Sequence, residues 1–202
     1  MSENPSRIEP ARLEEFPSSV GDLVAEIASK SSALGSSLHP RTSANLAELV
    51  RVMNTYYSNL IEGHNTRPVD IQRALAGEFA EDSERRDLQI EAAAHVRVQA
   101  KIDRLMDEEL LPEPASRKFI LWLHQEFYRD ASEKTLLIQG TGSSFVMKPG
   151  AWRVGSAQNV AVGRHLPPSS DCVEDFMVYF EKRYCFEGMG MSARILSLAA
   201  AH

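Results

Sequence analysis

Apolar and polar residues recur with a helical period over much of the chain, most clearly in the stretch 44–63. Its apolar side chains follow one another at spacings of three and four residues, which places them on a single stripe of a helix. They are Leu46, Leu49, Val50, Met53, Tyr57, Leu60 and Ile61. We therefore predict an amphipathic helix over 44–63 that is capped by Asn45 with Glu48, buried along this stripe and stopped by Gly63.

Ser58 and Glu62 lie one above the other in the last turn of this predicted helix, because they are four residues apart. Their face points away from the apolar stripe, so burial of the helix does not require them. Taken alone, a serine and a glutamate on a polar helix face are typical of a solvated surface.

Similar patterns predict further helices downstream. A short helix is predicted with Thr66 as its cap and Pro68 in its first turn, and it ends near Gly77. A long, half-exposed helix covers about 84–110, another face runs through 119–128, and two more helices cover about 171–186, capped by Asp171, and 192–202. One side of the long helix carries Leu88, Ala92, His95, Val96, Gln99, Ile102 and Met106. We expect residues 1–40 to form a loosely attached arm with at most a short helix over 23–29 and a loop over 31–40, and residues 41–202 to form the main unit.

The character of the chain changes between Gln139 and Pro168, where several glycines flank two short β-prone runs. These runs are Ser144–Met147 and Asn159–Val162, and they predict an irregular loop that carries a β-hairpin over about 144–163. The expected fold class is therefore mainly α with one β-hairpin.

Composition narrows the possible functions. The 202 residues carry a formal net charge of −6, and no run of Lys or Arg provides the basic patch that nucleic acid or an anionic membrane requires. Arg85 and Arg86 are flanked by Glu84 and Asp87. No signal peptide or membrane-spanning apolar run is present, and the two cysteines suit free thiols, so we expect a cytoplasmic protein.

Candidate chemistry is sparse when only the residues are considered. The six histidines are scattered without a metal-ligand spacing, and no serine or cysteine stands in a nucleophile motif, so we expect no metal site. The residues by themselves therefore indicate a mostly helical domain and no complete catalytic site.

Several separated stretches resemble one family, the Fic proteins. Residues 58–63, Ser-Asn-Leu-Ile-Glu-Gly, match the family's inhibitory motif Ser/Thr-x-x-x-Glu-Gly/Asn, in the arrangement where the inhibitory helix precedes the catalytic core. The following Asn65-Thr66-Arg67, the stretch 88–103 and the helix 171–184 also fit. The pieces 148–153, 159–163 and 166–168 resemble the family's hairpin flap, and the likeness covers about residues 40–202.

The resemblance implies a protein adenylyltransferase (AMPylation), which transfers AMP from ATP to a Ser, Thr or Tyr hydroxyl of a target protein with Mg²⁺. The family's active-site loop, His-Pro-Phe-x-x-Gly-Asn-Gly-Arg, supplies the general base, an acidic ligand for Mg²⁺ and an arginine for the phosphates. The inhibitory glutamate pairs with that arginine, so the γ-phosphate can no longer settle productively. By the resemblance, the inhibitory residues are Glu62, Ser58 and Gly63. A target-docking edge that works by strand addition consists of Trp152, Val160, Ala161, Val162 and Gly163.

The family's active-site loop occurs nowhere in the 202 residues. The resemblance then implies a truncated Fic-like helical core, the N-terminal portion of an autoinhibited enzyme, which is inactive alone and binds neither ATP nor Mg²⁺ tightly. Two alternatives stay open: a non-catalytic helical fragment that binds a partner through the apolar side of Ile195, Leu196 and Leu198, and a degenerate gene fragment. A homo-oligomer and the identity of the target protein also stay open.

Overall fold

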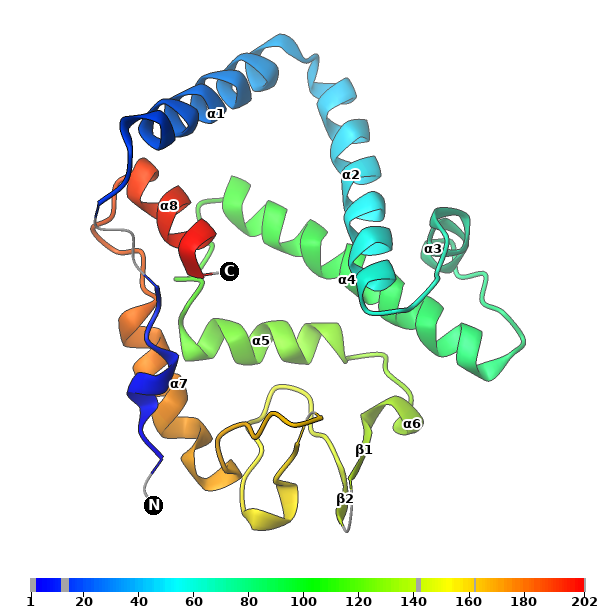
Figure 1. Cartoon of the computed structure of the whole chain (residues 1–202). Helices are drawn as coiled ribbons and strands as arrows, with labels where there is room; N and C mark the ends of the chain where they lie inside the picture. Colours follow the sequence, from blue (N-terminus) through cyan, green and yellow to red (C-terminus); the bar gives the residue numbers. More distant parts are fainter. Residues whose placement is uncertain (1–2, 12–14, 141–142, 162, 202) are drawn as a thin grey trace.

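The computed structural model describes residues 3–11, 15–140, 143–161 and 163–201. This part of the chain is mainly helical and contains one two-stranded antiparallel hairpin, which confirms the predicted class (Figure 1). The elements are η1 (Pro5–Ile8), α1 (Ser18–Ser37), α2 (Pro40–Ile61), α3 (Pro68–Leu75), α4 (Ser83–Asp107), α5 (Arg117–Phe127), α6 (Glu133–Leu136), β1 (Leu137–Gly140), β2 (Ser143–Val146), η2 (Ser156–Gln158), η3 (Ser170–Cys172), α7 (Val173–Arg183) and α8 (Met191–Ala201).

Helix α4 is the centre of the fold. Helices α2 and α3 pack on one side of it, and α5 returns alongside it on another (Figure 1). Ala92 and Val96 are buried on one side of α4, whereas Ala94 and Val98 are buried on the opposite side. Residues two positions apart point to nearly opposite sides of a helix. Both sides of α4 are buried because it has α2 and α3 on one side and α5 on another. The prediction of a single buried side is right for Ala92 and Val96 and wrong for the helix as a whole.

A small core joins α2, α3 and α4. It consists of Val52, Ile71, Ala92 and Val96, with Tyr56 packed against it. Two polar contacts tie α2 to α4 beside this core: Gln99 Nε2 donates to Thr55 Oγ1 at 3.2 Å, and Arg51 pairs with Asp103 at 2.7 Å. These contacts hold the C-terminal half of α2 on the central helix.

The buried face of α2 differs from the predicted stripe. Helix α2 begins at Pro40, with His39 as its cap, and it buries Val52, Thr55 and Asn59. Thr55 is small and has its hydroxyl satisfied by Gln99, so it lets the two helices approach closely. The predicted stripe is instead largely exposed at Leu46, Leu49, Val50, Tyr57, Leu60 and Ile61.

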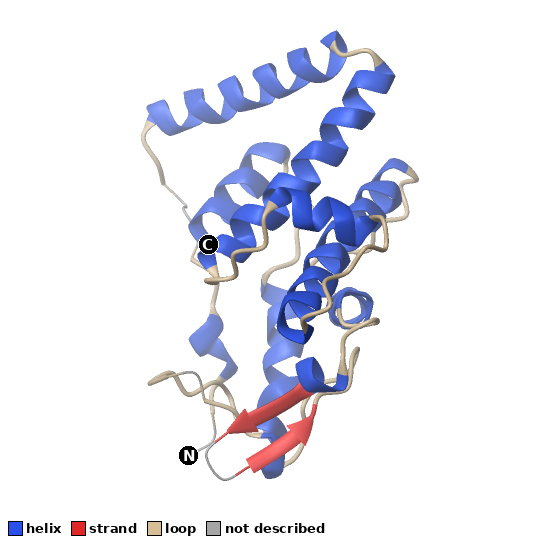
Figure 2. Ribbon diagram, turned by 90° about the vertical axis from the view of Figure 1, so that its right-hand side faces the viewer, coloured by secondary structure: helices blue, strands red, loops and turns tan. Residues whose placement is uncertain are grey.

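The N-terminal residues are more ordered and better attached than the sequence predicts. Helix α1 has 20 residues, so both the short helix over 23–29 and the loop over 31–40 are wrong. It packs against α8, while η1 packs against α7. Tyr184 Oη donates to the Ile8 carbonyl at 2.9 Å, and Glu9 pairs with Arg183. Figure 2 shows α1 at one end of the molecule and the hairpin at the other.

The hairpin uses a different partner strand from the predicted one. Strand β2 pairs with β1, in the register Ile138↔Phe145, and residues 159–161 are not in a strand. Strands that are adjacent in the chain pair at the smallest cost in loop entropy, which favours this local arrangement. The side chain of Asn159 instead accepts from Ser170 N at 2.8 Å, and Val162 lies outside the described residues.

The last two helices lie close to their predicted positions. The stretch predicted as one helix over 171–186 begins with η3 and continues as α7. Asp171 does not cap α7; its carboxylate accepts from Gly155 N at 3.1 Å. Helix α8 follows the prediction as far as Ala201, and His202 lies outside the described part. Among the described helices, none has the length and apolar character that crossing a membrane requires.

Candidate functional site

The C-terminal end of α2, which carries the predicted inhibitory residues, closes in a Schellman motif. Gly63 N donates to the Leu60 carbonyl at 3.1 Å, and His64 N donates to the Asn59 carbonyl at 2.7 Å. This motif needs a left-handed residue, and Gly63 supplies it with φ of +82°. The helix therefore ends at Gly63 as predicted, and Glu62 is its C-cap residue.

The side chains of Ser58 and Glu62 are both exposed. Within the described residues, the Glu62 carboxylate has no hydrogen-bond or ion-pair partner. A carboxylate at this position faces the negative end of the helix dipole, which disfavours it by about 0.3–1 kcal/mol. Helix stability therefore does not explain Glu62, and its two oxygens are available to a guanidinium group.

Polar groups surround the turn that follows Glu62. His64 Nδ1 lies 3.6 Å from Glu91 Oε1 on α4, which places the turn over the central helix. Asn59 is buried, and its Nδ2 has no hydrogen-bond partner in the described part of the chain. The turn is thus held by its backbone and by α4, while Ser58 and Glu62 face outward.

Over its described residues, 152–161 and 163, the predicted docking segment is irregular and contains only the short helix η2. Its conformation is held by side chains: Arg153 Nη1 donates to Ser170 Oγ at 2.8 Å, and Gln158 Oε1 accepts from Val154 N at 2.7 Å. Trp152 and Val160 are half-buried, and Ala161 and Gly163 are exposed. The segment does not form a strand edge, so the strand addition predicted for it has no preformed edge in the described residues.

A histidine of α5 holds the backbone just before this segment. His124 Nδ1 accepts from Gly150 N at 2.9 Å. Burial lowers the pKa of His124, which favours the neutral imidazole that can accept this hydrogen bond. Burial also lowers the pKa of His95 on α4, although the nearby Glu91 opposes the shift.

The structure does not bring the two predicted parts of the site together. The end of α2 lies against α4, and the segment 148–161 lies beyond α5 (Figure 1). In the described ranges, no group of three or more His, Cys, Asp or Glu residues is placed to hold a metal ion. Comparison with protein-family models, with curated proteins and with solved structures gives no match.

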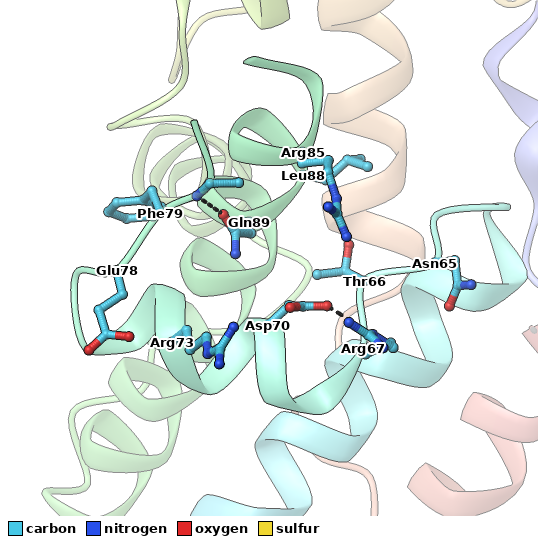
Figure 3. Close-up of a pocket in the computed structure, with 11 residues that line it drawn as sticks. Asn65, Thr66, Arg67, Asp70, Arg73, Glu78, Phe79, Arg85, Leu88 and Gln89 are labelled. Atoms are coloured by element: carbon cyan, nitrogen blue, oxygen red, sulfur yellow. Dashed lines mark hydrogen bonds and ion pairs between the residues drawn. The ribbon is translucent and has the colours of Figure 1, made fainter. Parts of the chain in front are cut away.

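A cavity that the sequence did not indicate opens just after the α2–α3 turn. Its volume is about 420 Å³, and it lies between α3, the loop that follows α3 and the start of α4 (Figure 3). Three arginines line it: Arg67, Arg73 and Arg85. They are far enough apart in sequence that only the packing of α3 on α4 brings them to one place, and acidic neighbours mask Arg85 in the sequence.

Proposed function

We propose that this chain is the N-terminal portion of an autoinhibited protein adenylyltransferase of the Fic type, in which Glu62 is the inhibitory residue. The match of residues 58–63 to the family's inhibitory motif supports this most directly, and the exposed Glu62 side chain has no partner among the described side chains that would occupy it. A carboxylate there can accept both N–H groups of an arginine fork, which is what inhibition of the phosphate-binding arginine requires.

The surroundings of Glu62 also support the proposal. Gly63 ends α2 in a fixed geometry, and the core around Ile71 holds the helix on α4. The carboxylate therefore sits on a rigid support, so that its pairing with an incoming arginine costs little conformational entropy beyond that of the side chain. In this proposal the catalytic base, the Mg²⁺ ligand and the arginine come from the active-site loop, which these 202 residues do not contain.

The test uses the complete gene product with labelled ATP and measures AMP incorporation into protein. We expect Glu62→Gly to raise incorporation by about tenfold or more, because one charge-assisted pair contributes about 1.5–3 kcal/mol. Glu48→Gln is the matched control, since Glu48 is an exposed carboxylate on the same helix. Unchanged incorporation in the Glu62→Gly protein rejects the inhibitory role. A reading frame that stops soon after His202, before any His-Pro-Phe, rejects the enzyme itself.

A second candidate function is self-association without catalysis. Helices α1 and α2 leave large apolar side chains exposed, and such side chains are typical of an interface where they gather in one patch. The most exposed are Leu23, Ile27, Leu34, Leu49, Tyr57 and Ile61. Helix α8, by contrast, buries Leu196 and exposes Leu198. Sedimentation of the chain as a monomer at all concentrations contradicts this candidate.

A further inference from the structure

The arginine-lined cavity has a rigid wall. The loop after α3 closes in a second Schellman motif, in which Gly77 has φ of +83° and Glu78 N donates to the Arg73 carbonyl at 2.9 Å. The buried Gln89 accepts from Ala80 N at 2.7 Å, and Arg86 donates to the Ala80 carbonyl at 2.9 Å. These bonds fix the loop on α4, so the cavity is formed before any ligand enters.

The charges in the cavity are unevenly paired. Arg67 pairs with Asp70 at 3.2 Å. The guanidinium groups of Arg73 and Arg85 have no side-chain partner in the described residues, although both line the cavity. The remaining carboxylate that lines the cavity is that of Glu78, which has no ion-pair partner in the described residues. Two unpaired arginines, the Arg67–Asp70 pair and the Glu78 carboxylate therefore surround a space that is open to small molecules, and positive charges are in excess.

A buried hydroxyl provides an independent indication of a ligand. Thr66 is only 5% exposed, and its Oγ1 has no hydrogen-bond partner within the part of the chain that is described. Figure 3 shows this hydroxyl directed toward Arg85, on the cavity side of the turn. Buried hydroxyl groups are normally satisfied, and an unsatisfied one destabilises the fold. An anion oxygen that reaches Thr66 from the cavity would satisfy it.

We infer that this cavity binds the phosphate group of a small phosphorylated molecule. Arg73 and Arg85 supply the fork-shaped donors that match phosphate oxygens, and Thr66 supplies a hydroxyl donor. The N-terminal end of α3, which has no side-chain cap, lies at the same cavity and adds a favourable dipole. A volume of about 420 Å³ lies within the range of small-molecule sites. The inference does not depend on the proposed function, because it uses neither Glu62 nor any residue outside this chain.

The experiment measures binding to the 202-residue chain by calorimetry with inorganic phosphate, AMP and adenosine as probes. We expect AMP to bind and adenosine not to bind. Inorganic phosphate distinguishes the two sources of the anion. If inorganic phosphate binds as tightly as AMP, the site is one for free phosphate; if inorganic phosphate binds more weakly than AMP, the site is one for a phosphorylated molecule. Raised salt is expected to weaken binding, because the contacts are ionic.

Variants locate the binding. Arg73→Gln and Arg85→Gln are each expected to weaken binding by about tenfold or more. Thr66→Val keeps the shape of the side chain, so it is expected to weaken binding several-fold without lowering the melting temperature. Arg104→Gln is the matched control, since Arg104 is an exposed arginine of α4 outside the cavity. The inference is overturned if no phosphate-bearing probe binds below about 10 mM, if adenosine binds as tightly as AMP, or if the arginine variants bind like the control.

Discussion

Ile71 is the side chain whose truncation tests the arrangement of α2, α3 and α4 most directly. It is fully buried, with 0% exposure, and belongs to the core cluster with Val52, Ala92 and Val96. Truncation of a buried isoleucine to alanine costs about 2–5 kcal/mol, and the cost rises with the cavity that remains. Ala92 is too short to fill the space, and α4 is held on its other side by α5. We therefore expect Ile71→Ala to lower the free energy of unfolding by about 3–4 kcal/mol.

Urea unfolding followed by circular dichroism measures this loss. At about 2–4 °C per kcal/mol for a chain of this size, the melting temperature should fall by about 6–16 °C. Ile71→Val should cost only about 1 kcal/mol. Val69→Ala is the control on the same helix, and it should change stability by less than about 0.5 kcal/mol because Val69 is exposed. If Ile71→Ala costs no more than Val69→Ala, α3 does not pack on α2 and α4 as described.

Three further predictions concern two helix ends and the half-buried His124. Gly63→Ala should lower the free energy of unfolding by about 1 kcal/mol, because φ is +82° and no atom obstructs the new methyl group. Glu109→Gly should raise the free energy of unfolding by about 0.5–1 kcal/mol, since Glu109 follows the end of α4 with φ of +55°. Urea unfolding measures both changes, and the argument is contradicted if the two substitutions shift the free energy of unfolding in the same direction. Burial lowers the pKa of His124 below its usual 6.5, so the unfolded chain takes up the proton first. The contribution of its bond to Gly150 is complete above pH 6.5 and is lost as the pH falls below that value. His124→Asn should reduce the loss of unfolding free energy between pH 7.5 and 5.5, as measured by denaturant titrations. The same loss in the variant as in the unmodified protein would refute the role of His124. His95 contributes to the pH dependence in the same direction, because burial lowers its pKa too.

Local chemistry made the ends of several helices predictable. Pro68 begins α3, and Gly63 and Gly77 follow helix ends in left-handed geometry, as expected. These features depend on the backbone preferences of single residues, which act whatever the rest of the chain does. The caps predicted at Asn45 and Thr66 were wrong. His39 and Pro40 begin α2 earlier, and Arg67 precedes α3 without a side-chain cap bond.

The candidate site was predictable only in part. The place of Glu62 at a helix end followed from its distance to Gly63. Its exposure did not follow from the apolar stripe, because Leu60 and Ile61 of that stripe are exposed as well. The strand edge predicted at 152–163 was wrong: β2 pairs with β1, its neighbour in the chain, and residues 159–161 are not in a strand. Whether Glu62 inhibits an enzyme stays a prediction.

The amino-acid sequence by itself determined that this protein is mainly helical, where several helices end and that Glu62 closes α2. These properties follow from periodicity and from backbone preferences, which are local. Only the tertiary structure decided which face of α2 is buried and which arginines meet: Thr55 lies in the interface because Gln99 satisfies it, and Arg73 and Arg85 share a cavity because α3 packs on α4. Periodicity shows that a helix has two faces, but the partner that covers one of them comes from distant residues.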